Sequence, residues 1–226
     1  MLQLVIGNKN YSSWSMRPWV LLRQLSIPFE ERKLRFDFSE GSAFRQAVAQ
    51  INPAGQVPVL VDGSTVVWDT LAIAEYLHEA FPAAGVWPAG APQRARARSV
   101  CAEMHAGFGA LRNHCPMNVE ASLPEVGARV WAEQPGVRQN VARIEAIFAD
   151  ALAGQGGPFL FGEFSAADAY FAPVCLRLDG YALPASDATR GYMTRVMASR
   201  GAAAWIADAK AEQDFLDFEE PYRTHR

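Results

Sequence analysis

Three serines stand in one polar turn, residues 10–18 (NYSSWSMRP), just ahead of a predicted helix. Pro18 has no N–H, so it fits the first turn of that helix and little deeper. We therefore expect Ser15 to be the N-cap. Ser12 and Ser13 would then lie beside the positive end of the helix dipole, where a hydroxyl can donate a hydrogen bond to an anion. The alternative is a polar loop without a ligand, which these residues alone favour.

A second segment with chemical potential is NPAGQVP, residues 52–58. Pro58 starts a strand directly after a glycine turn, which is a setting typical of cis proline. A cis bond would leave the N–H and C=O of Val57 facing outward, where an extended peptide could pair with them as an added strand. The alternative is an ordinary trans proline on an edge strand, which is the commoner case.

The third segment is Trp68-Asp69-Thr70, ahead of another predicted helix. Either Asp69 or Thr70 is a natural N-cap. The helix N–H groups and the Thr70 hydroxyl could also bind a carboxylate, and Asp69 could accept a hydrogen bond from an ammonium group. Capping alone is the plainer interpretation.

Alternating strand and helix patterns must position these segments. Apolar and β-branched runs predict strands, and helical spacing of apolar residues predicts helices. Asp62-Gly63 indicates a hairpin turn. The expected strands are residues 2–6, 29–35 and the hairpin 57–68; the expected helices are 16–25, 42–51 and 70–80. The order β-α-β-α-β-β-α is that of a thioredoxin-like domain.

The chain changes character after residue 81. Residues 82–92 (PAAGVWPAGAP) have the composition of a linker. Beyond them we expect only helices, at residues 94–111, 125–152, 165–178, 187–199 and 202–213. The sequence thus predicts an α+β chain with a thioredoxin-like domain at 1–81, a linker at 82–92 and an all-helical domain at 93–226.

Composition narrows the class of protein. Half of the 226 residues are hydrophobic, which is enough for a packed core, and the formal net charge of -3 argues against nucleic acid as a partner. The three cysteines show no metal-binding spacing, so we expect neither a metal site nor a disulfide scaffold. No leader or membrane-spanning apolar stretch is visible, so we expect a cytoplasmic protein.

Taken together, the segments resemble the glutathione transferase superfamily. SSWSMR is similar to the serine motif of zeta-class and related enzymes, SSCSWR, and NPAGQVP is similar to the cis-proline loop of the family. WDTLAIAEYL resembles the family's Glu-Ser or Gln-Ser segment and the helix after it. Ser165 and Asp168 resemble the family's capping box. The resemblance is strong over residues 1–82 and weaker between 93 and 160.

This resemblance implies glutathione as cosubstrate. Ser12 would donate its hydroxyl to the glutathione sulfur, and Ser13 is the next candidate. Val57, with Pro58 cis, would pair with the cysteinyl backbone. Asp69 and Thr70 would hold the amine and the carboxylate of the γ-glutamyl end. Candidates for the glycine carboxylate are Arg45, Gln56 and Arg35.

Two positions depart from the family pattern. Trp14 stands where zeta-class enzymes have cysteine. This argues against a mixed disulfide with glutathione at the turn and against maleylacetoacetate isomerase activity. Asp69-Thr70 replaces Glu-Ser, and the shorter aspartate shifts the expected contact with the amine.

The pocket for the second substrate is expected between the domains, where small-molecule sites tend to form. Tyr11 and Trp14 would contribute from the first domain. The helical domain offers Met104, His105, Phe108 and Arg112. Met104, Phe108 and Leu111 share a helix face, so we expect at least two of them to pack in the core. His105 and Arg112 share a helix face and could bind an anionic substrate, although solvent exposure or an internal hydrogen bond is the stronger interpretation.

The expected activity is transfer of the glutathione thiolate to a small electrophile, in a homodimer with a role in detoxification. A thiol pKa of about 8.5 would fall by roughly one to two units under a serine hydrogen bond and the helix dipole. The alternatives are a glutathione-dependent isomerase and a non-catalytic binding protein of the same fold.

Overall fold

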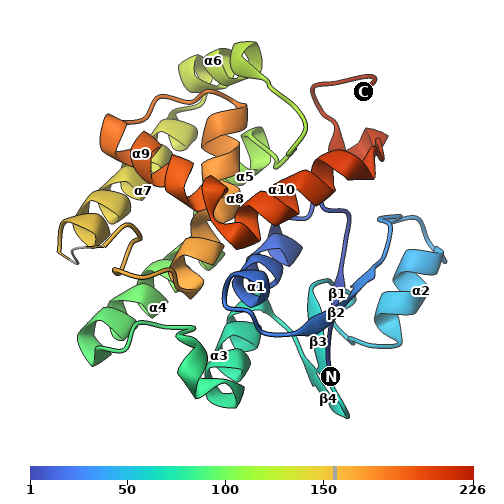
Figure 1. Cartoon of the computed structure of the whole chain (residues 1–226). Helices are drawn as coiled ribbons and strands as arrows, with labels where there is room; N and C mark the ends of the chain where they lie inside the picture. Colours follow the sequence, from blue (N-terminus) through green and yellow to red (C-terminus); the bar gives the residue numbers. More distant parts are fainter. Residues whose placement is uncertain (155–156) are drawn as a thin grey trace.

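The computed structural model describes residues 1–154 and 157–226. A small four-stranded sheet with three helices lies beside a larger group of helices, and the two pack against each other along α1 (Figure 1). This arrangement confirms the predicted α+β fold class. Within the described residues, no helix is both long and apolar enough to cross a membrane.

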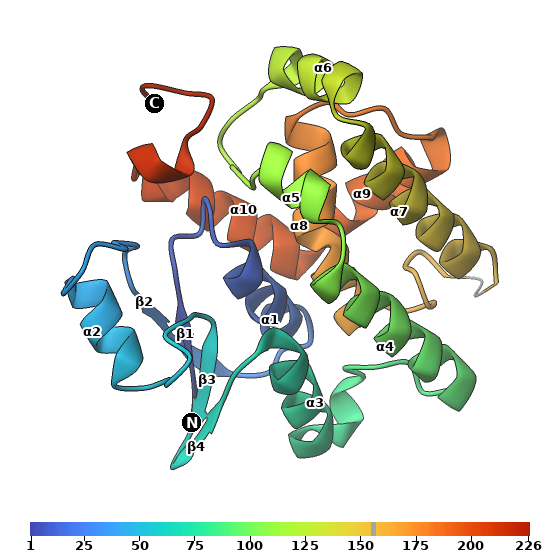
Figure 2. The same cartoon turned by 180° about the vertical axis from the view of Figure 1, so that it is seen from behind.

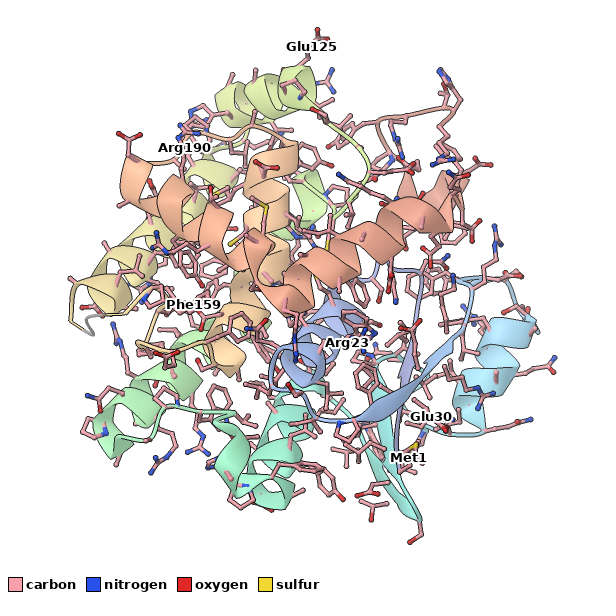
Figure 3. All side chains as sticks on the ribbon, viewed as in Figure 1. Met1, Arg23, Glu30, Glu125, Phe159 and Arg190 are labelled. Carbon is pink, nitrogen blue, oxygen red and sulfur yellow. The ribbon has the colours of Figure 1, made fainter. Side chains whose placement is uncertain are left out.

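The sheet has the strand order β2-β1-β3-β4. Its strands are β1 Leu2–Ile6, β2 Phe29–Lys33, β3 Val59–Asp62 and β4 Thr65–Val67. β1 is parallel to β2 and antiparallel to β3, with Val5 opposite Val59. β2 is an edge strand with a run of charged residues, and Glu30 on it is exposed (Figure 3). Charge of this kind protects a sheet edge from pairing with other chains.

Three helices accompany the sheet: α1 Ser13–Gln24, α2 Ala43–Ala49 and α3 Thr70–Ala80. α1 and α3 lie on the side of the sheet that faces the helical part, and α2 lies on the opposite side (Figures 1 and 2). The observed order confirms the predicted β-α-β-α-β-β-α sequence of elements.

The start of α1 differs from the prediction. Ser12, not Ser15, occupies the N-cap position, and Ser15 lies in the first turn. Pro18 therefore sits inside the helix. The Ser15 hydroxyl accepts a hydrogen bond from the backbone N–H of Gly7 at 3.2 Å. Because this tertiary contact uses Ser15, the helix begins three residues earlier than the expected Ser15 cap would place it.

The helical part contains seven α-helices among the described residues. They are α4 Ala91–Ala106, α5 Gly109–His114, α6 Pro124–Glu133, α7 Pro135–Ala153, α8 Ala166–Gly180, α9 Asp187–Ala198 and α10 Arg200–Glu212, and the short 3-10 turns are Pro82–Ala84 and Asp217–Glu219.

Two of the five predicted helices are in fact helix pairs. The helix expected at 94–111 breaks at Gly107, and Phe108 then adopts a left-handed conformation with φ of 57° before α5. The helix expected at 125–152 breaks at Gln134, because Pro135 starts a new helix and cannot donate to the previous turn.

A continuous apolar core joins the sheet to the helices. α1 packs on both α8 and α10, so Met16 and Trp19 belong to the same cluster as Phe171 and Trp205. Gly201 allows this close approach, because a Cβ there would lie 2.4 Å from the Val20 carbonyl oxygen. The junction therefore holds the start of α1 in a fixed place relative to α8.

The predicted capping box at the start of α8 is confirmed. The Ser165 hydroxyl accepts from the N–H of Ala167, and Asp168 accepts from the N–H of Ser165 at 2.9 Å. Asp168 is fully buried and also accepts from Leu160 N–H and the Tyr192 hydroxyl. This network fixes the long buried helix that carries Arg177.

Candidate functional site

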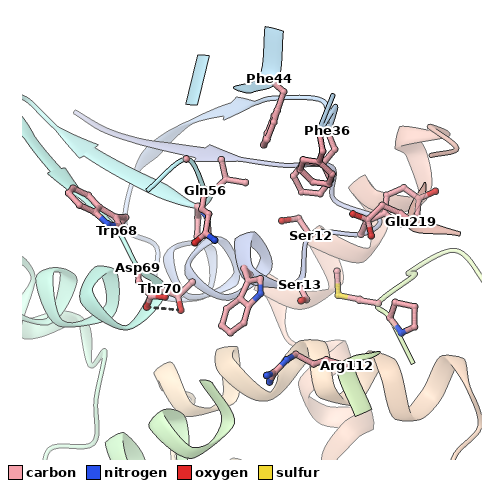
Figure 4. A pocket seen from close by; sticks show the side chains of 18 of the residues that line it. Ser12, Ser13, Phe36, Phe44, Gln56, Trp68, Asp69, Thr70, Arg112 and Glu219 are labelled. Carbon is pink, nitrogen blue, oxygen red and sulfur yellow. Dashed lines mark hydrogen bonds between the residues drawn. The ribbon is translucent and has the colours of Figure 1, made fainter. Parts of the chain in front are cut away.

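A cavity of about 620 Å³ lies between the sheet part and the helical part. Figure 4 shows its walls: Ser12 and Ser13 at the start of α1, Gln56 on the loop before β3, Asp69 and Thr70 at the start of α3, and Arg112 on α5. The volume falls in the range of pockets for small molecules and cofactors. The three polar segments singled out in the sequence therefore meet at one place.

The two serines at the start of α1 are buried in the wall of this cavity. Ser12 Oγ is hydrogen-bonded to Ser15 Oγ at 2.7 Å, and either hydroxyl can rotate to be the donor. Ser13 Oγ accepts from the Arg177 guanidinium at 3.1 Å. Within the described residues, the N–H groups of Trp14 and Ser15 meet no acceptor. The start of α1 thus presents donors to an anion.

The peptide bond between Val57 and Pro58 is cis, as the resemblance to the family implied. Asn52, which is buried, holds the loop: it donates to the Gln56 carbonyl at 2.8 Å and accepts from the Ala54 N–H at 2.9 Å. In the part of the chain that is described, the Val57 backbone has no hydrogen-bond partner. This edge is therefore open to an extended peptide.

Asp69 is the N-cap of α3 and accepts from the Leu71 N–H at 2.9 Å. Its other oxygen lies 2.7 Å from His105 Nε2 on α4. Thr70 lines the cavity beside it. The aspartate thus combines the capping role with a place in the cavity wall, and the two interpretations given by the sequence are compatible.

The remaining predicted residues divide into two groups. Those that line the cavity are Tyr11, Trp14, Gln56, Val57, Pro58, His105 and Arg112. Those outside its lining are Met104, Phe108 and Arg45. Met104 and Phe108 are buried in the core, and Arg45 is exposed on α2. Arg35, the other basic candidate for the glycine carboxylate, is paired with Asp214.

Tyr11 precedes the serines, but its hydroxyl is already engaged. It donates to Glu220 at 2.7 Å and accepts from the Leu216 N–H. Burial, together with the bond to Glu220, raises the pKa of Tyr11 to about 12. The phenol therefore remains protonated and holds the C-terminal segment, which leaves the serines as the hydroxyl donors at the start of α1.

Buried arginines are the main feature that the sequence analysis missed. Arg177 on α8 lines the cavity and is 6% exposed, and burial lowers its pKa to about 10. Arg17 is 1% exposed, and its guanidinium carbon lies 3.9 Å from the centre of the Trp14 ring. The sequence signal that could have found Arg177 is its place within the apolar run AYFAPVCLRL. A charged residue in such a run is expected to be buried, and a buried charge needs a partner.

The other lining residues have no site role assigned from the sequence, although Asn52, Gly55 and Trp68 lie in segments that the sequence analysis singled out. They are Phe36, Phe38, Phe44, Asn52, Gly55, Trp68, Pro116, Met117 and Glu219. Most come from loops and from the C-terminal segment, whose positions no local pattern specifies. The cavity as a whole offers a helix N-terminus, an open strand edge, a carboxylate and two guanidinium groups to a ligand.

Comparison with known proteins gives two family matches. The model described as glutathione S-transferase, N-terminal domain, matches residues 11–80, and the C-terminal domain model matches residues 92–208.

Individual proteins agree with these matches. A zeta-class glutathione S-transferase from Euphorbia esula is 28% identical over 165 residues, which cover 72% of this chain and 70% of that protein. A dichloromethane dehalogenase from Methylorubrum extorquens is 44% identical over 66 residues, but the match covers only 28% of this chain and 22% of the dehalogenase. The fold is similar to that of a glutathione transferase homologue from Burkholderia GL BGR1 with bound glutathione, at a TM-score of 0.67, 23% identity and coverage of 93% and 98%.

Proposed function

Because the chain belongs to the glutathione S-transferase family, we propose that its cavity binds glutathione and that a serine hydroxyl stabilises the thiolate for attack on a small electrophile. The observation that carries this proposal is the meeting of Ser12 and Ser13 with the open edge at Val57 across one cavity. The Burkholderia homologue, which has bound glutathione, supports the choice of ligand.

In this proposal glutathione extends along the loop before β3. Its cysteinyl backbone pairs with Val57, and its γ-glutamyl end reaches Asp69 and Thr70. The carboxylate of Asp69 accepts from the ammonium group, and the N-terminus of α3 binds the carboxylate. The sulfur is then at the start of α1, next to Ser12.

A chain of hydroxyl groups supports Ser12 as the donor. The Gly7 N–H donates to Ser15 Oγ, and Ser15 can in turn donate to Ser12 Oγ. The Ser12 proton is then free to point at the sulfur. A hydrogen bond to a charged acceptor contributes about 1.5–3 kcal/mol, which lowers the thiol pKa by roughly one to two units. Ser13, which accepts from Arg177, is the second donor in reach of the cavity.

The reaction then needs no protein nucleophile. The thiol proton leaves to solvent, the sulfur forms a bond to the electrophilic carbon, and the leaving group departs with its electron pair. The three cysteines are buried, and burial raises the pKa of the Cys115 thiol to about 12, so these side chains stay protonated. The protein holds the thiolate close to the electrophile, which itself accelerates the reaction.

Replacement of single serines tests the proposal. We expect Ser12→Ala to remove most of the glutathione thiolate at neutral pH, as measured by ultraviolet absorbance of the complex, and to lower kcat/KM by about 10- to 100-fold. Ser15→Ala should have a smaller effect in the same direction because it removes only the second hydroxyl of the chain.

The matched variant Ser13→Ala is the control. If it abolishes the thiolate while Ser12→Ala retains it, Ser13 is the donor and our assignment is wrong. Failure of the wild-type protein to bind a glutathione resin would contradict the whole proposal and favour a binding protein of another specificity. Net consumption of thiol separates a transferase from an isomerase, since an isomerase returns glutathione unchanged.

A further inference from the structure

Two guanidinium groups line the same cavity from its helical side. Arg112 comes from α5 and Arg177 from α8. Arg177 donates to the Cys115 carbonyl and to Ser13 Oγ. Arg112 donates from one nitrogen to two backbone carbonyls near the end of α4. A guanidinium has five N–H donors, so each group has donors left over for a ligand.

No salt bridge neutralises these groups among the described residues, although the charge of Glu219 acts on Arg177 and that of Asp69 acts on Arg17. Among residues 1–154 and 157–226, neither Arg112, Arg177 nor the nearby Arg17 forms an ion pair. Burial, together with repulsion from Arg177 and Arg112, lowers the pKa of Arg17 to about 9. Buried charges in proteins are normally paired, so an anion is expected to join this cluster.

The location separates this cluster from the proposed γ-glutamyl site. Figure 4 shows Arg112 below Ser13, whereas Asp69 and Thr70 lie at another side of the cavity. Apolar surface lies near the cluster: the centre of the Trp14 ring is 5.8 Å from the Arg112 guanidinium carbon, and Pro116 and Met117 line the cavity together with the acidic Glu219.

We propose that Arg112 and Arg177 form an anion subsite that holds a carboxylate on an otherwise apolar electrophile, next to Ser13. This inference rests on the proposed function, because it assigns the second substrate of the same cavity. The anion supplies the salt-bridge partner that neither guanidinium has among the described residues, and the apolar walls receive the rest of the molecule. Charge-assisted bonds of this kind are the strong ones in binding sites.

Binding of an unreactive anion tests the subsite without catalysis. The protein is first saturated with S-methylglutathione, which cannot form a thiolate. It is then titrated with 3-nitrobenzoate or with the neutral 3-nitrobenzamide, and heat is measured. We expect the benzoate to bind at least about 10-fold more tightly than the amide, since only the benzoate carries the charge.

Substitution of Arg112 locates the binding. Arg112→Gln should weaken 3-nitrobenzoate binding by about 10- to 100-fold and leave 3-nitrobenzamide binding within about threefold. Arg112→Lys should retain much of the affinity because it keeps the charge. Arg129→Gln, at an exposed position on α6, makes the same change of net charge away from the cavity and should have no effect. Retained affinity for S-methylglutathione shows that each variant is folded.

Three results would overturn the proposal: equal affinity for benzoate and amide, equal losses in Arg112→Gln and Arg129→Gln, or competition, in which the benzoate binds the free protein but not the protein saturated with S-methylglutathione. The last would assign the arginines to a carboxylate of glutathione itself. Failure of S-methylglutathione to bind would instead contradict the proposed function. In that case, titration of the free protein with 3-nitrobenzoate and 3-nitrobenzamide tests the anion subsite independently of the glutathione site.

Discussion

Glu219 is the acidic side chain whose charge opposes the proposed anion subsite. It lines the cavity from the C-terminal segment, and burial raises its pKa while the field of Arg177 lowers it. Its removal should therefore favour an anion. We expect Glu219→Gln to bind 3-nitrobenzoate about two- to fivefold more tightly in the same titration. Asp217→Asn, on the same 3-10 turn but exposed, is the matched control. Unchanged or weaker binding in Glu219→Gln would show that Glu219 does not act on the subsite.

At the scale of single residues, the sequence was most informative where a residue type has few uses. Pro58 after a glycine turn and Asp69 before a helix both occupy the expected positions in the structure. Ser15 was misassigned because three serines could cap α1, and the contact that selects between them comes from Gly7, on another element. Arg177 could not be assigned to the cavity because its neighbours there are Ser13 and Cys115, far away in the chain.

The capping box of α8 leads to a prediction at the scale of elements. Burial raises the pKa of Asp168 to about 6, although hydrogen bonds from Leu160 and Ser165 favour the charged form. The folded state thus binds a proton more tightly than the unfolded state. The contribution of Asp168 to the free energy of unfolding is largest below the pKa that this residue has in the unfolded chain. It declines as the pH rises through about 6.

Asp168→Asn tests this sign. Asparagine puts an amide donor where the carboxylate accepts, so we expect the variant to lose about 1–3 kcal/mol of unfolding free energy. The asparagine side chain does not titrate. The difference in unfolding free energy between the wild type and the variant should therefore narrow by roughly 1 kcal/mol between pH 5 and pH 7. Urea unfolding at both pH values measures the gap. A gap that widens with pH would mean that the folded pKa is depressed instead of raised.

Element types were predictable and element ends were less so. The strand expected at 2–6 and the helix expected at 70–80 have clear sequence patterns, and their boundaries agree with those of β1 and α3. The helix expected at 94–111 has no local signal strong enough to reveal the left-handed Phe108. That conformation is compensated by tertiary packing, since Phe108 is buried in the main core.

At the scale of the whole molecule, the segment after α10 joins the sheet part to the helical part. Leu216 packs with Tyr11, Phe36 and Phe44 in a second apolar cluster. Glu220 is buried and accepts from Tyr11 and Asn118 as well as Arg223. This segment thereby supports the turn that carries the two serines, because Tyr11 immediately precedes Ser12.

Glu220→Ala should destabilise the molecule at this junction. The change leaves Tyr11, Asn118 and Arg223 without their shared acceptor, which costs about 3 kcal/mol and lowers Tm by roughly 6–12 °C. Although burial raises the pKa of Glu220, the hydrogen bonds from Arg223 and Tyr11 hold it below its ordinary value. The stabilisation is therefore present at neutral pH and is lost as the pH falls through that lowered value, so the difference in Tm should shrink in acid. Thermal unfolding of Glu220→Ala beside Glu133→Ala, a variant at an exposed site on α6, checks both statements. If the two variants unfold at the same temperature, Glu220 does not hold the C-terminal segment to the serine turn.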